Sequence, residues 1–75
     1  MQSIRKILAT NIKLLRKNKN ISQEQLGFLS GLHRTYISDI ECERRNVSIE
    51  NIEKIAKVLN VQPYKLLIDE SIKED

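Results

Sequence analysis

The 75-residue sequence has little of what enzymes, secreted proteins and membrane proteins require. Its single cysteine, Cys42, excludes an internal disulfide, and with one histidine it leaves no recognisable zinc ligand set. No apolar run approaches the roughly 18 residues of a membrane span, and the N-terminus has no signal-peptide pattern. A glycine-rich phosphate loop and paired carboxylates in apolar surroundings are also missing. We therefore expect a cytoplasmic protein that is not an enzyme and has no metal, cofactor, membrane contact or small-molecule substrate.

Aromatic residues are scarce as well, while basic residues are concentrated in one part of the chain. Three aromatic side chains are too few for the stacking platform of a single-stranded RNA binder. Residues 1–45 contain nine Lys or Arg against four Asp or Glu, whereas residues 46–75 contain four against six. This split indicates a basic working half, although a solvated surface without function would produce it equally well. One short domain has a thin margin of stability, which dimerisation would improve.

Apolar residues recur at helical spacing throughout, and no segment alternates as a strand does. Ser22 and Gln25 form a capping box, Gly31 supplies a left-handed helix end, Ser48 can cap a helix and Pro63 suits a first turn. The sequence therefore predicts an all-α bundle of five short helices, near residues 3–18, 23–30, 34–43, 49–59 and 63–68. The positions predicted to face inward are Ile4, Ile7, Leu8, Ile12, Leu15, Ile37, Ile40, Ile52, Ile55, Ala56 and Leu59.

Residues 22–43 contain two short helices joined by a glycine-containing turn, which is the spacing of a helix-turn-helix. The residues that carry a family likeness are Ser22-Gln23-Glu24-Gln25-Leu26-Gly27, Ser30-Gly31-Leu32 and Tyr36-Ile37-Ser38-Asp39-Ile40-Glu41. This run resembles the Cro and λ-repressor type of helix-turn-helix, often called XRE-like, over residues 8–68. Residues 34–38, followed by Ile40-Glu41 and Arg45-Asn46, are most similar to the controller proteins of bacterial restriction-modification systems.

The resemblance implies a λ-repressor-like DNA-binding domain and a small dimer that regulates its own operon and the endonuclease gene. Gly27 departs from the family, which usually has alanine there, and its flexibility is expected to weaken the second helix by roughly 0.5 to 1 kcal/mol. The resemblance also implies an ion pair between Arg16 and Glu41, linking the first helix to the end of the third.

The recognition helix supplies the candidate base contacts. Arg34 can donate two hydrogen bonds to guanine O6 and N7, and Thr35 can touch a thymine methyl group or a phosphate. Tyr36 can contact either, or simply pack near Ile40. Asp39 can accept from cytosine N4 or only repel phosphates. The predicted base contacts are Arg34, Thr35, Tyr36, Ser38 and Asp39.

Predicted phosphate contacts flank this helix. At the start of the second helix, backbone N–H groups and the amide of Gln23 can hold a phosphate, and the resemblance implies that Gln23 also supports the recognition helix. His33 can cap the recognition helix or touch the DNA backbone. A solvated loop is the alternative for the three residues that follow the recognition helix. The predicted phosphate contacts are Gln23, His33, Arg44, Arg45 and Asn46.

The C-terminal segment, about residues 60–72, carries more apolar side chains than one small core needs. We predict a dimer face there, with completion of the monomer core as the alternative. A twofold dimer implies a near-palindromic operator with half-sites about 34 Å apart. The predicted interface residues are Asn60, Tyr64, Leu67, Ile68 and Ile72.

The partners expected are double-stranded operator DNA, a second copy of the chain and, as a further candidate, RNA polymerase. The protein would act in the bacterial cytoplasm and on the nucleoid when bound. A function of another class stays open, namely an antitoxin or adaptor that holds a protein partner through its C-terminal face or through Phe28. Phe28 itself is expected to face outward or to pack on the first helix.

Overall fold

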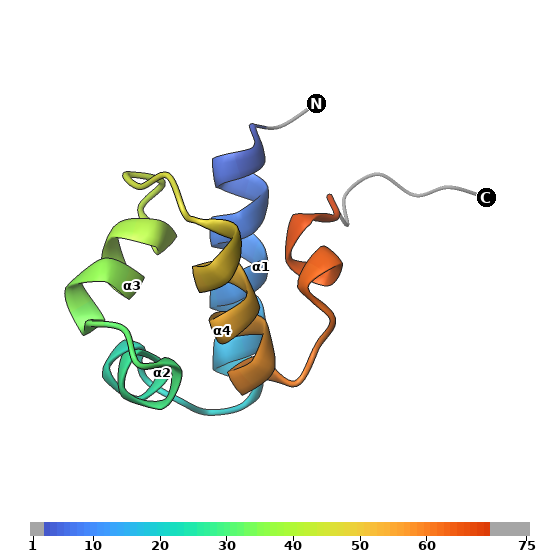
Figure 1. Cartoon of the computed structure of the whole chain (residues 1–75). Helices are drawn as coiled ribbons and strands as arrows, with labels where there is room; N and C mark the ends of the chain where they lie inside the picture. Colours follow the sequence, from blue (N-terminus) through green and yellow to red (C-terminus); the bar gives the residue numbers. More distant parts are fainter. Residues whose placement is uncertain (1–2, 70–75) are drawn as a thin grey trace.

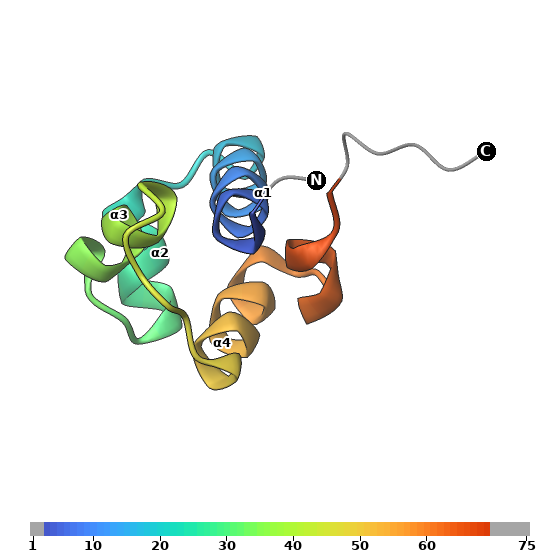
Figure 2. The same cartoon turned by 90° about the horizontal axis from the view of Figure 1, so that it is seen from above.

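The computed structural model describes residues 3–69, which form four α-helices and one 3-10 helix and contain no strand (Figure 1). The elements are α1 (Ile4–Asn18), α2 (Gln23–Ser30), α3 (Arg34–Glu41), α4 (Ile49–Leu59) and the 3-10 helix η1 (Pro63–Leu67). The predicted all-α class is confirmed. Helices α2 and α3 lie on one side of the molecule and η1 lies on the other, with α1 and α4 between them (Figures 1 and 2). Within residues 3–69 no helix is both long and apolar enough to cross a membrane.

Local capping sets the starts of the helices, as the sequence predicts. Ser22 Oγ accepts the N–H of Gln25 at 3.0 Å, and the Gln25 side chain accepts the N–H of Ser22 at 2.8 Å, so the capping box is complete. Ser48 Oγ accepts the N–H of Asn51 at 3.1 Å. Gly31 ends α2 with φ at 75°, a left-handed conformation that glycine adopts without strain. These bonds fix the two helices of the motif and the start of α4.

The predicted end of the third helix is wrong by two residues. Helix α3 ends at Glu41, Cys42 is its C-cap, and Glu43 has a φ of 64°. A left-handed residue stops an α-helix, but glutamate rarely adopts this conformation. The end of α3 at this point could therefore not be predicted from the presence of a glutamate at position 43.

Four of the five predicted short helices are α-helices, whereas the fifth segment is a 3-10 helix. The buried amide of Asn11 in α1 donates to the carbonyl oxygens of Lys65, Leu66 and Ile68, at 3.3, 3.0 and 2.9 Å. An α-helix would use such carbonyls for N–H groups four residues further along. With them bound to Asn11, η1 stays one short turn, and Ile68 is already extended.

One hydrophobic core joins all five elements. Burial of each large apolar side chain in it contributes roughly 1.5 to 3 kcal/mol. Leu66 of η1 is fully buried although the sequence did not point to it, whereas Ile4 leaves 57% of its surface exposed despite its place in the predicted stripe. The clustered core residues are Leu8, Ile12, Leu26, Ile37, Ile40, Ile55, Ala56, Leu59 and Leu66.

Gly27, which stands where the family usually has alanine, has a role in packing that the sequence comparison did not suggest. It is buried, and a Cβ atom there would lie 3.0 Å from both the backbone nitrogen of Arg34 and the carbonyl oxygen of Leu32. The turn between α2 and α3 therefore packs directly on the α2 backbone at Gly27. This close approach sets the distance between the two helices of the motif.

Candidate nucleic-acid interface

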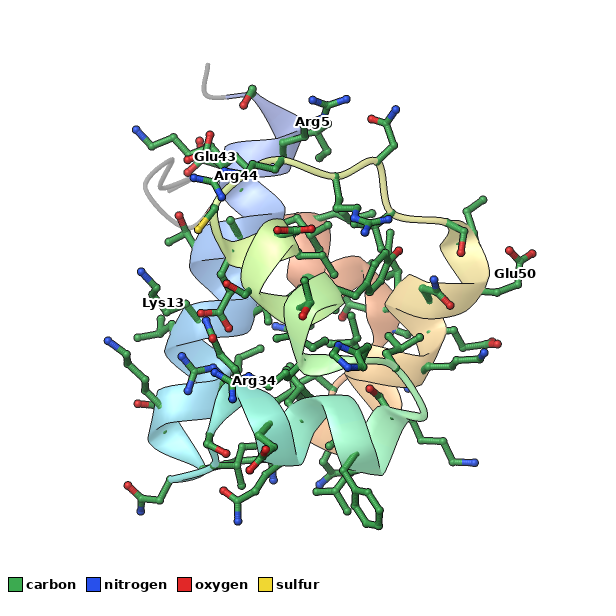
Figure 3. The ribbon with its side chains drawn as sticks, turned by 90° about the vertical axis from the view of Figure 1, so that its left-hand side faces the viewer. Arg5, Lys13, Arg34, Glu43, Arg44 and Glu50 are labelled. Carbon is green, nitrogen blue, oxygen red and sulfur yellow. The ribbon has the colours of Figure 1, made fainter. Side chains whose placement is uncertain are left out.

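Helix α3 presents its N-terminal residues to solvent. Arg34 and Thr35 are exposed, and Arg34 forms no ion pair or hydrogen bond through its guanidinium group within the part of the chain that the structure describes. In the view onto α3, the side chains of Arg34, Arg44, Arg5 and Lys13 lie around the helix (Figure 3). The same view also labels Glu43 and Glu50, so the four cations surround α3 on a surface that carries acidic side chains as well. The cations are the groups that suit the charge of a DNA backbone.

Two of the remaining predicted base contacts, Tyr36 and Asp39, lie in a cluster with Arg45. Arg45 Nε donates to Asp39 Oδ2 at 3.3 Å, and the Arg45 guanidinium lies 4.9 Å from the centre of the Tyr36 ring. The Tyr36 hydroxyl accepts from Asn51 Nδ2 at 3.0 Å, and the ring also packs against the edge of the core. Ser38 is half-buried and takes no part in these contacts. The structure thus joins two predicted base contacts to a residue that was predicted to bind phosphate.

His33 is the N-cap of α3. Its Nδ1 accepts the N–H of Thr35 at 3.1 Å, while the residue stays exposed. Capping was one of the two roles weighed for His33 from the sequence. A ring that caps the helix still lies on the solvent side of its first turn, so a phosphate contact stays a prediction.

A buried ion pair connects α1 to the end of α3. Arg16 Nε and Nη2 donate to the two carboxylate oxygens of Glu41 at 2.8 and 3.1 Å, and Arg16 Nη1 donates to the carbonyl of Ile21 at 2.9 Å. Gln23 Nε2 donates to Glu41 Oε1 at 3.1 Å. The amide of Gln23 thus supports the end of α3, as the resemblance implies, while its role as a phosphate contact stays a prediction.

The loop after α3 is tied to α1 by a residue that the sequence analysis missed. Arg5 donates through Nε to Asn46 Oδ1 at 3.1 Å, and its Nη2 contacts the same oxygen. Arg5 and Arg44 both appear toward the top of the view in Figure 3, where the chain leaves α3. Arg5 is 41 residues from Asn46 in the sequence, so no local pattern could have indicated the contact.

The helix-turn-helix family matches residues 12–66 of the chain. The chain belongs to this family. The control protein C.BamHI of Bacillus amyloliquefaciens is 54% identical over 66 residues, which are 87% of this chain and 82% of that protein. The crystal structure of the restriction-modification controller C.AhdI from Aeromonas hydrophila has a TM-score of 0.80 and 42% identity, covering 83% of this chain and 94% of that one. The biofilm regulator SinR, solved in complex with DNA, has a TM-score of 0.78 and 35% identity over 81% of this chain and 98% of its own.

Family membership confirms the predicted class, a DNA-binding transcription regulator of the XRE-like type and not an enzyme. Within the matched residues, α2, the turn at Gly31 and α3 have the predicted arrangement of two short helices joined by a glycine-containing turn. The predicted likeness to restriction-modification controllers is confirmed too.

Four of the five residues predicted to form a dimer face, namely Asn60, Tyr64, Leu67 and Ile68, lie within the described residues and are exposed in the single chain. Tyr64, Leu67 and Ile68 leave 58%, 39% and 37% of their surface uncovered, while Leu66 between them points into the core. Asn60 is the left-handed C-cap of α4, with φ at 58°. Ile72 lies outside the residues that the structure describes. Leu66, which was not among the predicted interface residues, is the side chain of η1 that completes the monomer core, and a dimer face formed by the exposed ones stays a prediction.

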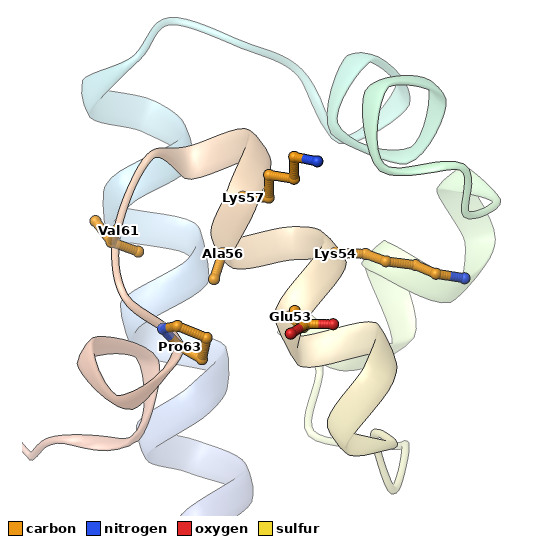
Figure 4. Close-up of a pocket in the computed structure, with 6 residues that line it drawn as sticks. All are labelled: Glu53, Lys54, Ala56, Lys57, Val61 and Pro63. Carbon is orange, nitrogen blue, oxygen red and sulfur yellow. The ribbon is translucent and has the colours of Figure 1, made fainter.

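Two other surface features were considered as binding sites, the exposed side chain of Phe28 and a hollow beside α4. Phe28 leaves 84% of its surface exposed, so of the two alternatives weighed for it the outward-facing one holds and packing on α1 is wrong. A hollow of about 440 Å³ lies between α4 and η1, lined by Glu53, Lys54, Ala56, Lys57, Val61 and Pro63. The charged ends of Lys54 and Lys57 point away from Val61 and Pro63, so the polar groups do not converge on a ligand (Figure 4).

Proposed function

We propose that this regulator is the controller of a restriction-modification system and that it binds as a homodimer to a near-palindromic operator. It would regulate its own operon and the endonuclease gene in the bacterial cytoplasm, on the nucleoid, with RNA polymerase as a further contact. The likeness to C.BamHI and C.AhdI supports the controller role. The observation that supports DNA reading is the exposed guanidinium of Arg34 at the first turn of α3, which has no partner among residues 3–69.

The contacts would divide into two kinds. Arg34, Thr35, Tyr36, Ser38 and Asp39 lie on α3 and would read bases, whereas Gln23, His33, Arg44, Arg45 and Asn46 flank it and would bind phosphates. The exposed positive side chains around α3 support the phosphate role, since each phosphate contact releases counterions from the DNA.

An electrophoretic shift with the DNA upstream of the gene, at physiological salt and with excess competitor, tests the proposal. A discrete complex that survives the competitor supports an autoregulator and defines the operator for footprinting. Persistent absence of such a complex contradicts it.

Arg34→Ala is expected to cost about 1 to 3 kcal/mol of binding free energy at one base pair and to relax the preference there, because a bidentate contact to guanine is lost. Arg44→Ala is the matched control. It removes an exposed cation from the loop, so it should weaken all sequences alike and lower the salt slope by about one. Titrations of operator and single-base variants at several salt concentrations measure both. An unchanged preference in Arg34→Ala would show that this arginine does not read a base.

Leu67→Glu is expected to convert the dimer to a monomer, because a carboxylate at a buried apolar interface costs several kcal/mol to desolvate. Sedimentation equilibrium measures the change. Phe28→Glu is the matched control, since Phe28 is also an exposed apolar residue but belongs to α2, across the molecule from η1 (Figure 2). If Leu67→Glu kept the association state of the parent protein, the dimer face would lie elsewhere.

A second candidate function is an antitoxin or adaptor module, and the exposure of Phe28 favours it. A largely exposed aromatic ring is a frequent anchor for a protein partner. A toxin gene beside this gene would support that function, whereas methyltransferase and endonuclease genes would support the controller.

A further inference from the structure

We propose that Asn51, which lies on α4 outside the helix-turn-helix, is a positioning residue for base reading and that it acts by holding Tyr36. The inference rests on the proposed function. It assigns a part in sequence recognition to a residue that faces the motif from the next helix.

Tyr36 is held from two directions. Asn51 Nδ2 donates to its hydroxyl at 3.0 Å, in partly buried surroundings, and the Arg45 guanidinium lies over its ring, 4.9 Å from the centre. The side chain of tyrosine has only two main torsions, so contacts at the hydroxyl and at the ring face together fix its direction. The orientation of this ring on α3 therefore depends on a hydrogen bond from α4.

Asn51 is itself fixed by the cap of α4. Its backbone N–H donates to Ser48 Oγ at 3.1 Å, and its side chain is half-buried. A residue in a capped first turn has little backbone freedom, so its amide is held in place before any DNA arrives. This makes Asn51 a rigid support for Tyr36.

The effect of Asn51 extends beyond Tyr36. Asp39 lies three residues after Tyr36 and so shares its face of α3. Arg45 touches both, through the ring of one and the carboxylate of the other at 3.3 Å. If the ring were released, Arg45 would lose one of its two contacts, and the group that Asp39 presents to a groove would change as well.

A purely structural role would give a different signature. Loss of one partly exposed hydrogen bond would then lower the stability slightly and weaken binding to every sequence alike. A positioning role predicts a change in base preference at the positions that Tyr36 faces, and it predicts that the change requires the Tyr36 hydroxyl.

Selection from a randomised DNA duplex pool, followed by binding titrations, tests the inference with the parent protein, Asn51→Ala, Tyr36→Phe and the double variant. Asn51→Ala is expected to reduce discrimination at one or two base positions by about 2- to 10-fold, the equivalent of one hydrogen bond. In the Tyr36→Phe background the same change is expected to have no further effect. Glu53→Ala, an exposed α4 substitution, should select the parent sequence.

Asn51→Asp gives a second test, because a carboxylate can accept from the tyrosine hydroxyl and so keep the pair. It is expected to retain the base preference while lowering the affinity for all DNA through its negative charge. An unchanged preference in Asn51→Ala, or an equal loss in both Tyr36 backgrounds, overturns the inference. A parent protein that selects no sequence would instead refute the proposed function, and this inference with it.

Discussion

Glu41→Ala is expected to lower the free energy of unfolding by about 3 to 5 kcal/mol, because it leaves the buried guanidinium of Arg16 without its counter-charge. The side chains of Arg16 and Glu41 are only 11% and 2% exposed. The substitution also removes the acceptor of the Gln23 amide. A domain of this size has a total stability of about 4 to 11 kcal/mol, so the loss is a large share of it. Urea denaturation followed by circular dichroism measures the change.

The matched control is Asp39→Ala, on the same helix. The pair of Asp39 and Arg45 has side-chain exposures of 26% and 47%, so its loss is expected to cost about 0 to 1 kcal/mol. Equal losses in the two variants would mean that burial does not distinguish the pairs.

Asn11→Asp is expected to lower the free energy of unfolding by about 2 to 4 kcal/mol, because a carboxylate cannot donate to the three carbonyls that the Asn11 amide binds. The charge would also face those oxygen atoms inside the protein. Since η1 carries Tyr64 and Leu67, the same variant is expected to associate less. Denaturation and sedimentation equilibrium measure the two effects.

Asn18→Asp is the control for Asn11→Asp. It makes the same chemical change at an exposed position of α1 and is expected to cost less than about 1 kcal/mol, from the unfavourable charge at a helix C-terminus. A stable Asn11→Asp protein with an unchanged association state would show that the amide of Asn11 does not hold η1.

Local signals predicted most of the helix boundaries. The capping box of Ser22 and Gln25, the cap at Ser48 and the glycine at Gly31 each act within one helical turn, so the sequence alone was enough. Glu43 adopts a left-handed conformation that its residue type disfavours, and the end of α3 was therefore misplaced.

Contacts between residues far apart in the chain could not be predicted from the sequence pattern. The amide of Asn11 determines the form of η1 from 54 to 57 residues away, and Arg5 meets Asn46 across 41 residues. Family resemblance supplied the one distant pair that was foreseen, Arg16 with Glu41. Which side chains contact bases and which contact phosphates depends on the bound DNA. For these residues the structure of the protein gives only their positions and their exposure to solvent.

Helix α1 binds both halves of the molecule within a short length of its axis. Asn11 holds η1 and Arg16 holds the end of α3, and five residues of α-helix separate them by about 7.5 Å. No loop lies between these two attachments to act as a hinge. In a dimer built through η1, the distance between the two recognition helices is then fixed by the rigid helix α1 of each copy. An operator with one extra base pair between its half-sites would have to be accommodated by twisting or bending of the DNA, at a cost that depends on the sequence of its central steps.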